Sequence, residues 1–193
     1  RNKSKKNHNI QIDLSKLNEI SETLNQNLSK KEKIKNIIFS QRYRGNDFNE
    51  NFNVSLFSIV KVIENLKNKL INGASIVIIQ SQARKYVLND HDIDYHLIHS
   101  ALDSLTRFYA VKFGKKSIRV NSVSTVAIKK PENKKFYTKN NEIQKLIKKI
   151  TPLNKMGDAK DVADVVNFLC SKKSSFVTGQ TIAVNGGIDL YSH

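Results

Sequence analysis

Two side chains that can exchange protons, Tyr95 and His99, stand four residues apart in this sequence. Apolar residues recur around them at steps of three and four, which predicts an amphipathic helix over 94–113. Residues four apart share a helix face, so the phenol and the imidazole are expected to be neighbours. A tyrosine phenol, with an ordinary pKa of about 10, is a poor base at pH 7 unless a nearby cation favours the phenolate. Histidine is mostly neutral at that pH, so it favours the phenolate less than a permanent cation would.

The elements that must position this pair follow from the pattern of apolar residues along the chain. Short apolar runs predict buried strands at 10–13, 34–39, 75–79, 118–124 and 181–184. Helical spacing predicts further helices at 14–28, 51–70, 142–150 and 158–170. Gly73 is expected to separate the second helix from the next strand, and Gly114 to end the 94–113 helix in the left-handed conformation. Asp158 and Asp161 have the spacing of a capping box. Because strands and helices alternate, we expect an α/β fold with a doubly wound, mainly parallel sheet in three layers.

Composition narrows the function classes. The 193 residues are 39% hydrophobic, enough for one globular domain, and no apolar run approaches the length of a membrane span. The single cysteine, Cys170, excludes an internal disulfide and suits a reducing compartment, so a cytoplasmic location is expected. His91 and His96 have no metal-ligand partners at suitable spacing, and no metal site is predicted. The net charge of +16 allows a nucleic-acid partner. The lysines are spread along the chain and do not form one block, however. This favours a general bias of amino-acid usage toward lysine over a nucleic-acid site.

Several segments in a fixed order resemble the short-chain dehydrogenase/reductase family. They include an apolar strand that ends in a serine, the helix with Tyr95, an Ile-Arg-Val-Asn strand and a C-terminal Val-Thr-Gly-Gln run with Asn-Gly-Gly. The segments are Gly73–Ser81, Tyr95–His99, Ile118–Asn121, Val177–Gln180 and Asn185–Gly187. The resemblance covers nearly the whole chain and implies a single Rossmann-like domain, residues 1–193, that lacks the first β-α-β unit.

The resemblance implies an oxidoreductase that uses NAD or NADP on a carbonyl or alcohol. A narrower likeness to members found with bacterial surface-sugar genes suggests a sugar-derived substrate. Carried over by position, Tyr95 is the acid/base, Ser81 polarises the substrate oxygen, and Asn53 places a water. The cofactor would meet four positions. These are His99 at the ribose, Asp13 near the adenine, and Thr125 with Val126 at the nicotinamide amide.

Three departures from the family pattern lie at cofactor-facing positions. His99 replaces the usual lysine, Phe39–Arg42 replaces Asn-Asn-Ala-Gly, and Thr125–Val126 replaces Pro-Gly. The alternative hypothesis is therefore a catalytically inactive relative that serves as a structural or binding subunit. The Gly-rich phosphate loop is also missing, so we expect the parent polypeptide to exceed 22.0 kDa.

Self-association is a further expectation. In the family, the helices corresponding to 51–70 and 94–113 pair across a two-fold axis, which implies a homodimer or homotetramer. The candidate residues for that seam are Leu56, Ile63, Leu102 and Phe108.

Overall fold

The computed structural model describes residues 9–139 and 141–190. Within them, the chain forms two compact units. The first contains the N-terminal part up to Lys33 and the segment Gln41–Lys69, and the second contains Ile34–Ser40 and everything from Leu70 onward.

The second unit is built on a four-stranded parallel sheet of order β1-β2-β3-β4. Its strands are β1 (Ile34–Phe39), β2 (Leu70–Ser81), β3 (Arg119–Thr125) and β4 (Thr181–Val184). β2 and β3 lie in the middle, and Ile76, Val77, Ile78, Val120 and Val123 are fully buried. Near-continuous burial is typical of parallel strands covered on both faces. The four predicted strands from position 34 onward are therefore confirmed.

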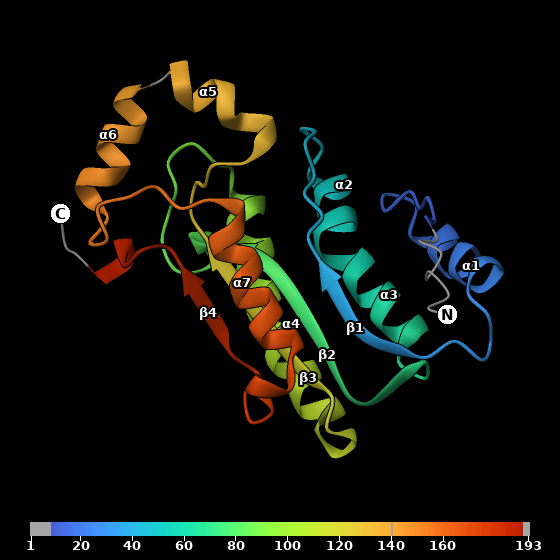
Figure 1. Cartoon of the computed structure of the whole chain (residues 1–193). Coiled ribbons are helices and arrows are strands. Elements are labelled where there is room, and N and C mark those ends of the chain that lie inside the picture. Colours follow the sequence, from blue (N-terminus) through green and yellow to red (C-terminus); the bar gives the residue numbers. More distant parts are fainter. Residues whose placement is uncertain (1–8, 140, 191–193) are drawn as a thin grey trace, which may run out of the picture. The chain divides into compact units, whose positions relative to one another are not determined.

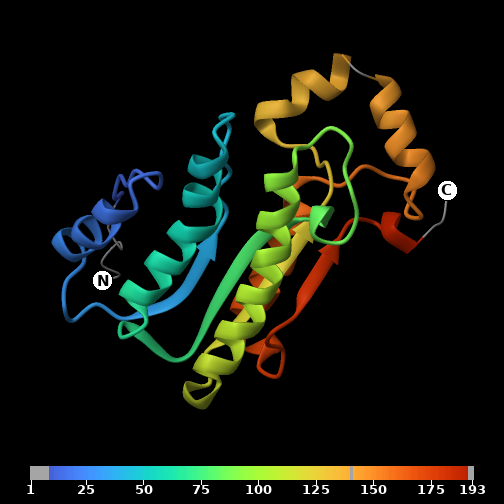
Figure 2. The ribbon, with the colours of Figure 1, turned by 180° about the vertical axis from the view of Figure 1, so that it is seen from behind.

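Helices cover both faces of this sheet and give the three predicted layers. α7 (Ala159–Cys170) lies on one face and α4 (Ile93–Phe113) on the other, as the two opposite views show (Figures 1 and 2). α7 begins with the predicted capping box, in which the Asp158 carboxylate accepts from the Lys160 and Asp161 amides and the Asp161 carboxylate accepts from the Asp158 amide. The fold is thus an α/β, mainly parallel, three-layer architecture.

An aliphatic core fills the space between α7 and the sheet. It consists of Val77, Val123, Ile128, Val162, Val166 and Leu169. At the C-terminal end of α7, Arg119 donates to the carbonyl oxygen of Leu169 at 2.7 Å and Ser75 donates to the same oxygen at 2.9 Å. These bonds satisfy a carbonyl that the helix itself leaves without a partner.

The first unit is helical. It contains α1 (Leu17–Asn27), α2 (Phe48–Phe52), a π-helical turn η1 (Asn53–Phe57) and α3 (Ser58–Leu66). In η1 the Ser58 amide donates to the Asn53 carbonyl, five residues back. α1 and α3 pack together, and the Asn65 amide donates to the Ser21 hydroxyl at 2.8 Å. The single helix predicted at 51–70 is therefore found at 48–66, interrupted by one wider turn.

Three expectations about local structure were wrong, and one short helix was not predicted. Residues 10–13 form no strand, because a lone short strand needs a neighbour for its backbone groups. Gly73 lies inside β2 with φ 77°, near a shift in the β1–β2 register. Gly114 has φ −55° and opens a 3₁₀ turn, η3 (Gly114–Lys116), so the left-handed residue is Ser117 at φ 54°. A short helix, α5 (Lys134–Lys139), precedes the predicted helix, which is found as α6 (Asn141–Ile150).

The predicted oligomer seam was largely wrong in its residues. Leu56, Ile63 and Leu102 are at most 9% exposed, so their own chain already covers them. Phe108 is 60% exposed and remains a candidate.

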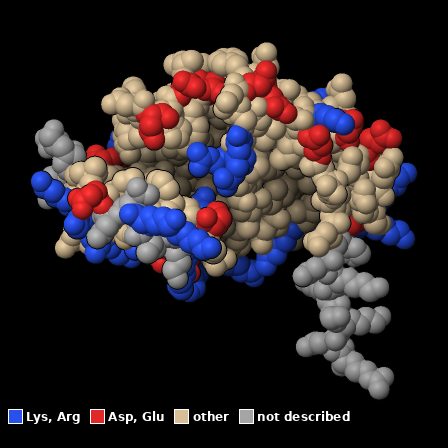
Figure 3. Space-filling model, turned by 90° about the horizontal axis from the view of Figure 1, so that it is seen from above, with Lys and Arg blue, Asp and Glu red and all other residues tan. Residues whose placement is uncertain are grey.

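The remaining short elements connect these layers. They are 3₁₀ turns: η2 (Gln82–Arg84), η4 (Pro131–Asn133), η5 (Lys172–Ser174) and η6 (Ile188–Leu190). Across the described residues, no helix has the length and apolar character needed to cross a bilayer. On the face in Figure 3, Lys and Arg occur together with Asp and Glu, separated by uncharged areas.

Candidate active site

Ser81 is the last residue of β2, and the chain turns sharply after it. The turn is η2, and it is closed by the Ser81 hydroxyl, which accepts from the Ala83 amide at 3.2 Å. The backbone amide of Ser81 donates to Nδ1 of His99 on α4 at 3.2 Å. The end of β2 is therefore tied directly to the helix that carries Tyr95.

Tyr95 and His99 are neighbours on α4, as their spacing predicts. Their ring centroids are 4.4 Å apart, and the rings meet edge to face at 75°. The ring of His91 lies 4.1 Å from the Tyr95 ring, and its Nδ1 is 3.0 Å from the Asp90 carboxylate. The His96 ring lies farther away, with its centroid 6.2 Å from that of Tyr95. Of these three imidazoles beside Tyr95, the spacing indicated only His99.

The bond from Ser81 decides the protonation state of His99. A ring nitrogen that accepts a hydrogen bond carries no proton, so Nδ1 is bare and the neutral ring carries its proton on Nε2. Protonation of Nδ1 would break the bond to the Ser81 amide. His99 therefore does not reproduce the permanent charge of a lysine.

The neighbouring His96 has a structural role. Its Nε2 accepts from the Leu88 amide at 2.9 Å, and its Nδ1 lies 3.0 Å from the Asp92 carbonyl oxygen. The ring joins the loop before α4 to the first turn of that helix.

Thr125 is the partner of Ser81 in the β2–β3 register, so the two residues end adjacent strands at the same edge of the sheet. The Thr125 hydroxyl donates to the carbonyl oxygen of Val126 at 3.2 Å, and both residues are half-buried. Ligands of open α/β sheets bind at the carboxyl ends of strands. The predicted cofactor-facing pair thus lies beside the predicted catalytic serine.

Two predicted site residues belong to the first unit. Asn53 opens the π-helical turn η1, a kind of turn often found at functional sites. Asp13 is exposed, and its carboxylate accepts from both the amide and the hydroxyl of Ser15. These hydrogen bonds hold the pKa of the Asp13 carboxyl below its usual value. Asp13 therefore forms a local turn ahead of α1.

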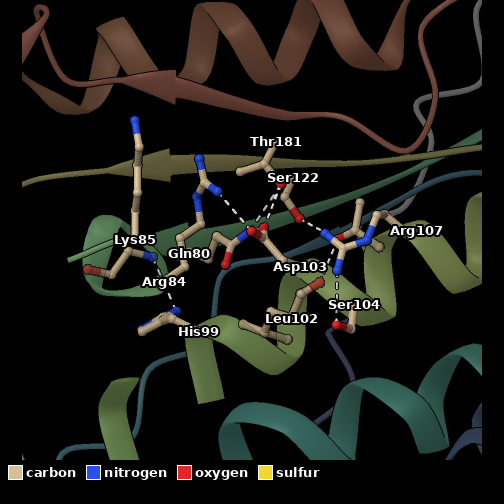
Figure 4. Close-up of polar contacts among 12 residues, drawn as sticks. Gln80, Arg84, Lys85, His99, Leu102, Asp103, Ser104, Arg107, Ser122 and Thr181 are labelled. Atoms are coloured by element: carbon tan, nitrogen blue, oxygen red, sulfur yellow. Dashed lines mark hydrogen bonds and ion pairs between the residues drawn. The ribbon is translucent and has the colours of Figure 1, made fainter. Parts of the chain in front are cut away.

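A carboxylate on α4 that sequence reasoning missed gathers three donors from other elements. Asp103 accepts from Gln80 at 2.8 Å, from Thr181 at 2.7 Å and from Arg84 at 2.8 Å (Figure 4). Burial raises the pKa of the Asp103 carboxyl, but hydrogen bonds from Thr181, Gln80 and Arg84, with the Arg84 charge, outweigh burial and hold the pKa below its usual value. A signal was present in the sequence, since Asp103 follows His99 by one helical turn.

The side chain of Gln82 is buried beside Ser81 and has unmet hydrogen-bonding capacity. It is 1% exposed, and within the described part of the chain neither its Nε2 nor its Oε1 has a partner. Buried polar groups normally find a protein, water or ligand partner. This end of the sheet therefore suits a polar ligand, as a nicotinamide cofactor and a hydroxylated substrate would be. The described residues contain no cluster of three His, Cys, Asp or Glu.

Known proteins are similar to this chain in sequence. A family model described as Enoyl-(Acyl carrier protein) reductase matches residues 10–189. L-xylulose reductase of Bos taurus is 32% identical over 143 residues, which cover 72% of this chain and 58% of that protein. Glucose 1-dehydrogenase of Gluconobacter oxydans is 30% identical over 115 residues, which cover 60% of this chain and 43% of that protein. The chain spans about half the length of these curated relatives.

Solved structures agree with the sequence matches. A short chain dehydrogenase family protein from Francisella tularensis superposes with a TM-score of 0.80 at 27% identity, over 94% of this chain and 81% of that one. A short-chain dehydrogenase/reductase described as glucose/ribitol dehydrogenase, from Brucella melitensis, gives 0.77 at 26% identity, over 94% and 75%. With the family model matching almost every residue and the strand ends arranged as described, the chain belongs to the short-chain dehydrogenase/reductase family.

Proposed function

We propose that the protein is an NAD(P)-dependent oxidoreductase that interconverts a carbonyl and an alcohol on a small, sugar-derived substrate. The substrate class is supported by two relatives, an L-xylulose reductase and a glucose 1-dehydrogenase, which are 32% and 30% identical to this chain over the aligned residues. A single Rossmann-like domain over residues 1–193 is part of the same proposal.

One observation carries this proposal. Ser81, at the end of β2, is hydrogen-bonded through its amide to His99, whose ring contacts the ring of Tyr95. A hydroxyl that can polarise an oxygen and a phenol that can exchange a proton are thereby held by two adjoining elements. Carbonyl reduction needs both groups close to the same oxygen atom.

The roles of these residues follow from their chemistry. A bound nicotinamide would supply or accept the hydride. The Tyr95 hydroxyl gives its proton to the carbonyl oxygen in reduction and takes it back in oxidation. The Ser81 hydroxyl donates a hydrogen bond to the same oxygen and stabilises the negative charge that develops there. Asn53 holds a water that connects the site to solvent.

Groups at the sheet edge would hold the cofactor. His99 would donate from Nε2 to the nicotinamide ribose, and the backbone of Thr125 and Val126 would contact the nicotinamide amide. Asp13 would be the residue for the adenine. A neutral His99 can hold a ribose but adds no charge beside Tyr95, so the phenolate is less favoured than beside a lysine.

The experiment is His99→Lys in the full-length protein, followed by nicotinamide absorbance with a panel of ketones and sugar nucleotides. An ammonium one helical turn from Tyr95 should favour the phenolate and supply a ribose donor. A pKa change of one unit corresponds to a tenfold change in population, so turnover should rise about tenfold or more and its pH optimum should fall.

Two controls make this result specific. Ser100→Lys adds the same charge at an exposed neighbouring position and should leave turnover unchanged. Tyr95→Phe should abolish turnover in either background. If neither wild type nor His99→Lys turns over, and neither shows a melting shift with NADH or NADPH, the inactive binding subunit replaces the oxidoreductase.

Self-association and location belong to the proposal as well. The outer face of α4 exposes Leu97, Phe108 and Val111, by 47%, 60% and 83%. These residues recur at helical spacing and suit an isologous homodimer or homotetramer contact. In light scattering, Val111→Glu should shift the protein toward monomer, whereas Val87→Glu, at a similarly exposed site, should not. A cytoplasmic location is supported by the single cysteine, Cys170.

A further inference from the structure

The turn η2 is joined to α4 at two places. The first is the bond from the Ser81 amide to Nδ1 of His99 at 3.2 Å. The second is the ion pair between Arg84 and Asp103 at 2.8 Å. Ser81 and Arg84 lie at the two ends of the turn, and His99 and Asp103 lie one helical turn apart on α4, so the two contacts run side by side.

The second contact is the more directional of the two. The side chains of Arg84 and Asp103 are 18% and 15% exposed, so water screens their charges only partly. Both carboxylate oxygens are used, Oδ2 by Arg84 and Oδ1 by Gln80 and Thr181. Hydrogen bonds from β2 and β4 therefore fix the carboxylate independently of its contact with Arg84. Figure 4 shows the three donors converging on it.

A comparison pair exists in the same turn. Lys85, directly after Arg84, reaches Asp189 at 3.1 Å, but its side chain is 52% exposed and extends away from Asp103 (Figure 4). An ion pair with an exposed partner is screened by water and contributes little, about 0–1 kcal/mol. The two carboxylates are similarly buried, Asp103 at 15% and Asp189 at 10% exposure, so the pairs differ in the exposure of the cation, 18% for Arg84 and 52% for Lys85.

We infer that Arg84 and Asp103 are positioning residues, which hold η2 so that the Ser81 amide meets His99 and the Ser81 hydroxyl keeps its orientation. This inference rests on the proposed function for its catalytic consequence. Arg84 and Asp103 would affect the site through Ser81 and His99, without contact with substrate or cofactor. Its structural consequence, the protection of one amide, does not depend on turnover.

The test measures hydrogen exchange of the Ser81 amide by NMR in the full-length protein. In Asp103→Asn this amide should exchange at least about tenfold faster than in wild type. A tenfold change in the exchange rate corresponds to a loss of about 1.4 kcal/mol in the stabilisation of the turn. The imidazole nitrogen shifts of His99 should move toward those of a ring that exchanges between tautomers. Arg84→Gln should give the same result and replaces Asp103→Asn if that variant does not fold.

Two controls accompany these variants. Lys85→Gln removes the ion pair of the same turn whose cation is exposed, and Asp164→Asn removes an exposed carboxylate of α7 that is paired with Lys160. Both should change Ser81 exchange by less than about twofold. Unchanged exchange and unchanged His99 shifts in folded Asp103→Asn and Arg84→Gln would overturn the inference, as would an equal effect in Lys85→Gln.

Activity gives a separate readout. If wild type turns over, Asp103→Asn should lower kcat by more than it raises KM, since the misplaced hydroxyl acts on the transition state. If wild type does not turn over, the proposed function fails, and the exchange data alone still decide whether Arg84 and Asp103 position Ser81.

Discussion

The two faces of the central sheet are built in different ways. Toward α7, the middle strands present Val77 and Val123 to an aliphatic cluster, and Ser75 and Arg119 hydrogen-bond the end of the helix. Toward α4, the same strands offer Gln80 to Asp103 and Ser122 to Thr106, whose hydroxyl oxygens are 2.6 Å apart.

This difference separates stability from positioning. Aliphatic packing is non-directional, so it stabilises the fold without fixing the orientation of any one group. Hydrogen bonds of buried polar groups fix direction, and they cost free energy when one partner is lost. The candidate catalytic residues lie along the polar face, where α4 meets the ends of the strands.

The largest effect is expected from Leu169→Ala, on the α7 face. Leu169 is fully buried, and its truncation should lower the free energy of unfolding by about 2–5 kcal/mol through lost burial and a cavity. Urea unfolding followed by circular dichroism measures this. Leu190→Ala, the same change at a side chain that is 80% exposed, should cost less than about 0.5 kcal/mol. Comparable losses of unfolding free energy in the two variants would contradict the stabilising role of the aliphatic cluster on the α7 face.

A smaller effect is expected from the hydroxyl pair on the α4 face. Thr106 and Ser122 are fully buried, and Thr106→Val leaves the Ser122 hydroxyl without its partner. The expected loss is about 1–3 kcal/mol. Thr106→Val combined with Ser122→Ala removes both partners and should be less destabilising than the single change. Simple additivity in this double-mutant cycle would show that the pair is not coupled.

The smallest expected effect is a pH dependence that sharpens the comparison. The pKa of Asp103 is lowered in the folded state, so its carboxylate contributes stability above about pH 4, and this contribution is lost as pH falls through the folded pKa. The stability difference between wild type and Asp103→Asn should therefore shrink between pH 6 and pH 3. Other carboxylates are present in both proteins and cancel. A difference that stays constant with pH would contradict a role for the charge.

Local patterns predicted most of the fold. β1 and β4 occupy the predicted residues, and the capping box at Asp158 was predicted from two residues three apart. These features depend on neighbours in sequence. The strand at 10–13 was wrong because a strand depends on pairing that no local pattern reports. The seam residues were wrong because helical spacing alone does not tell which apolar face the chain itself covers.

The site was less accessible to sequence reasoning. The adjacency of Tyr95 and His99 followed from their spacing, but the roles of Ser81, Tyr95 and His99 came only from a resemblance to known proteins. That His99 accepts a hydrogen bond required its distance to the Ser81 amide. The partners of Asp103 lie 19, 23 and 78 residues away in the sequence. Only the fold brings such distant residues together.

The π-helical turn at Asn53–Phe57 also affects how insertions and deletions in this helix should be interpreted. An α-helix advances about 100° per residue, and a turn bonded over five residues accommodates one residue more. Deleting one residue here would restore regular bonding and leave α3 in its present phase, because the wider turn already holds the extra residue. The buried side chains Ile59, Ile63 and Leu66 would keep their present face. The same deletion in the regular part of α3 would rotate the following residues by about 100°, so this turn is the place where a one-residue gap in an alignment changes chain length without changing helical phase.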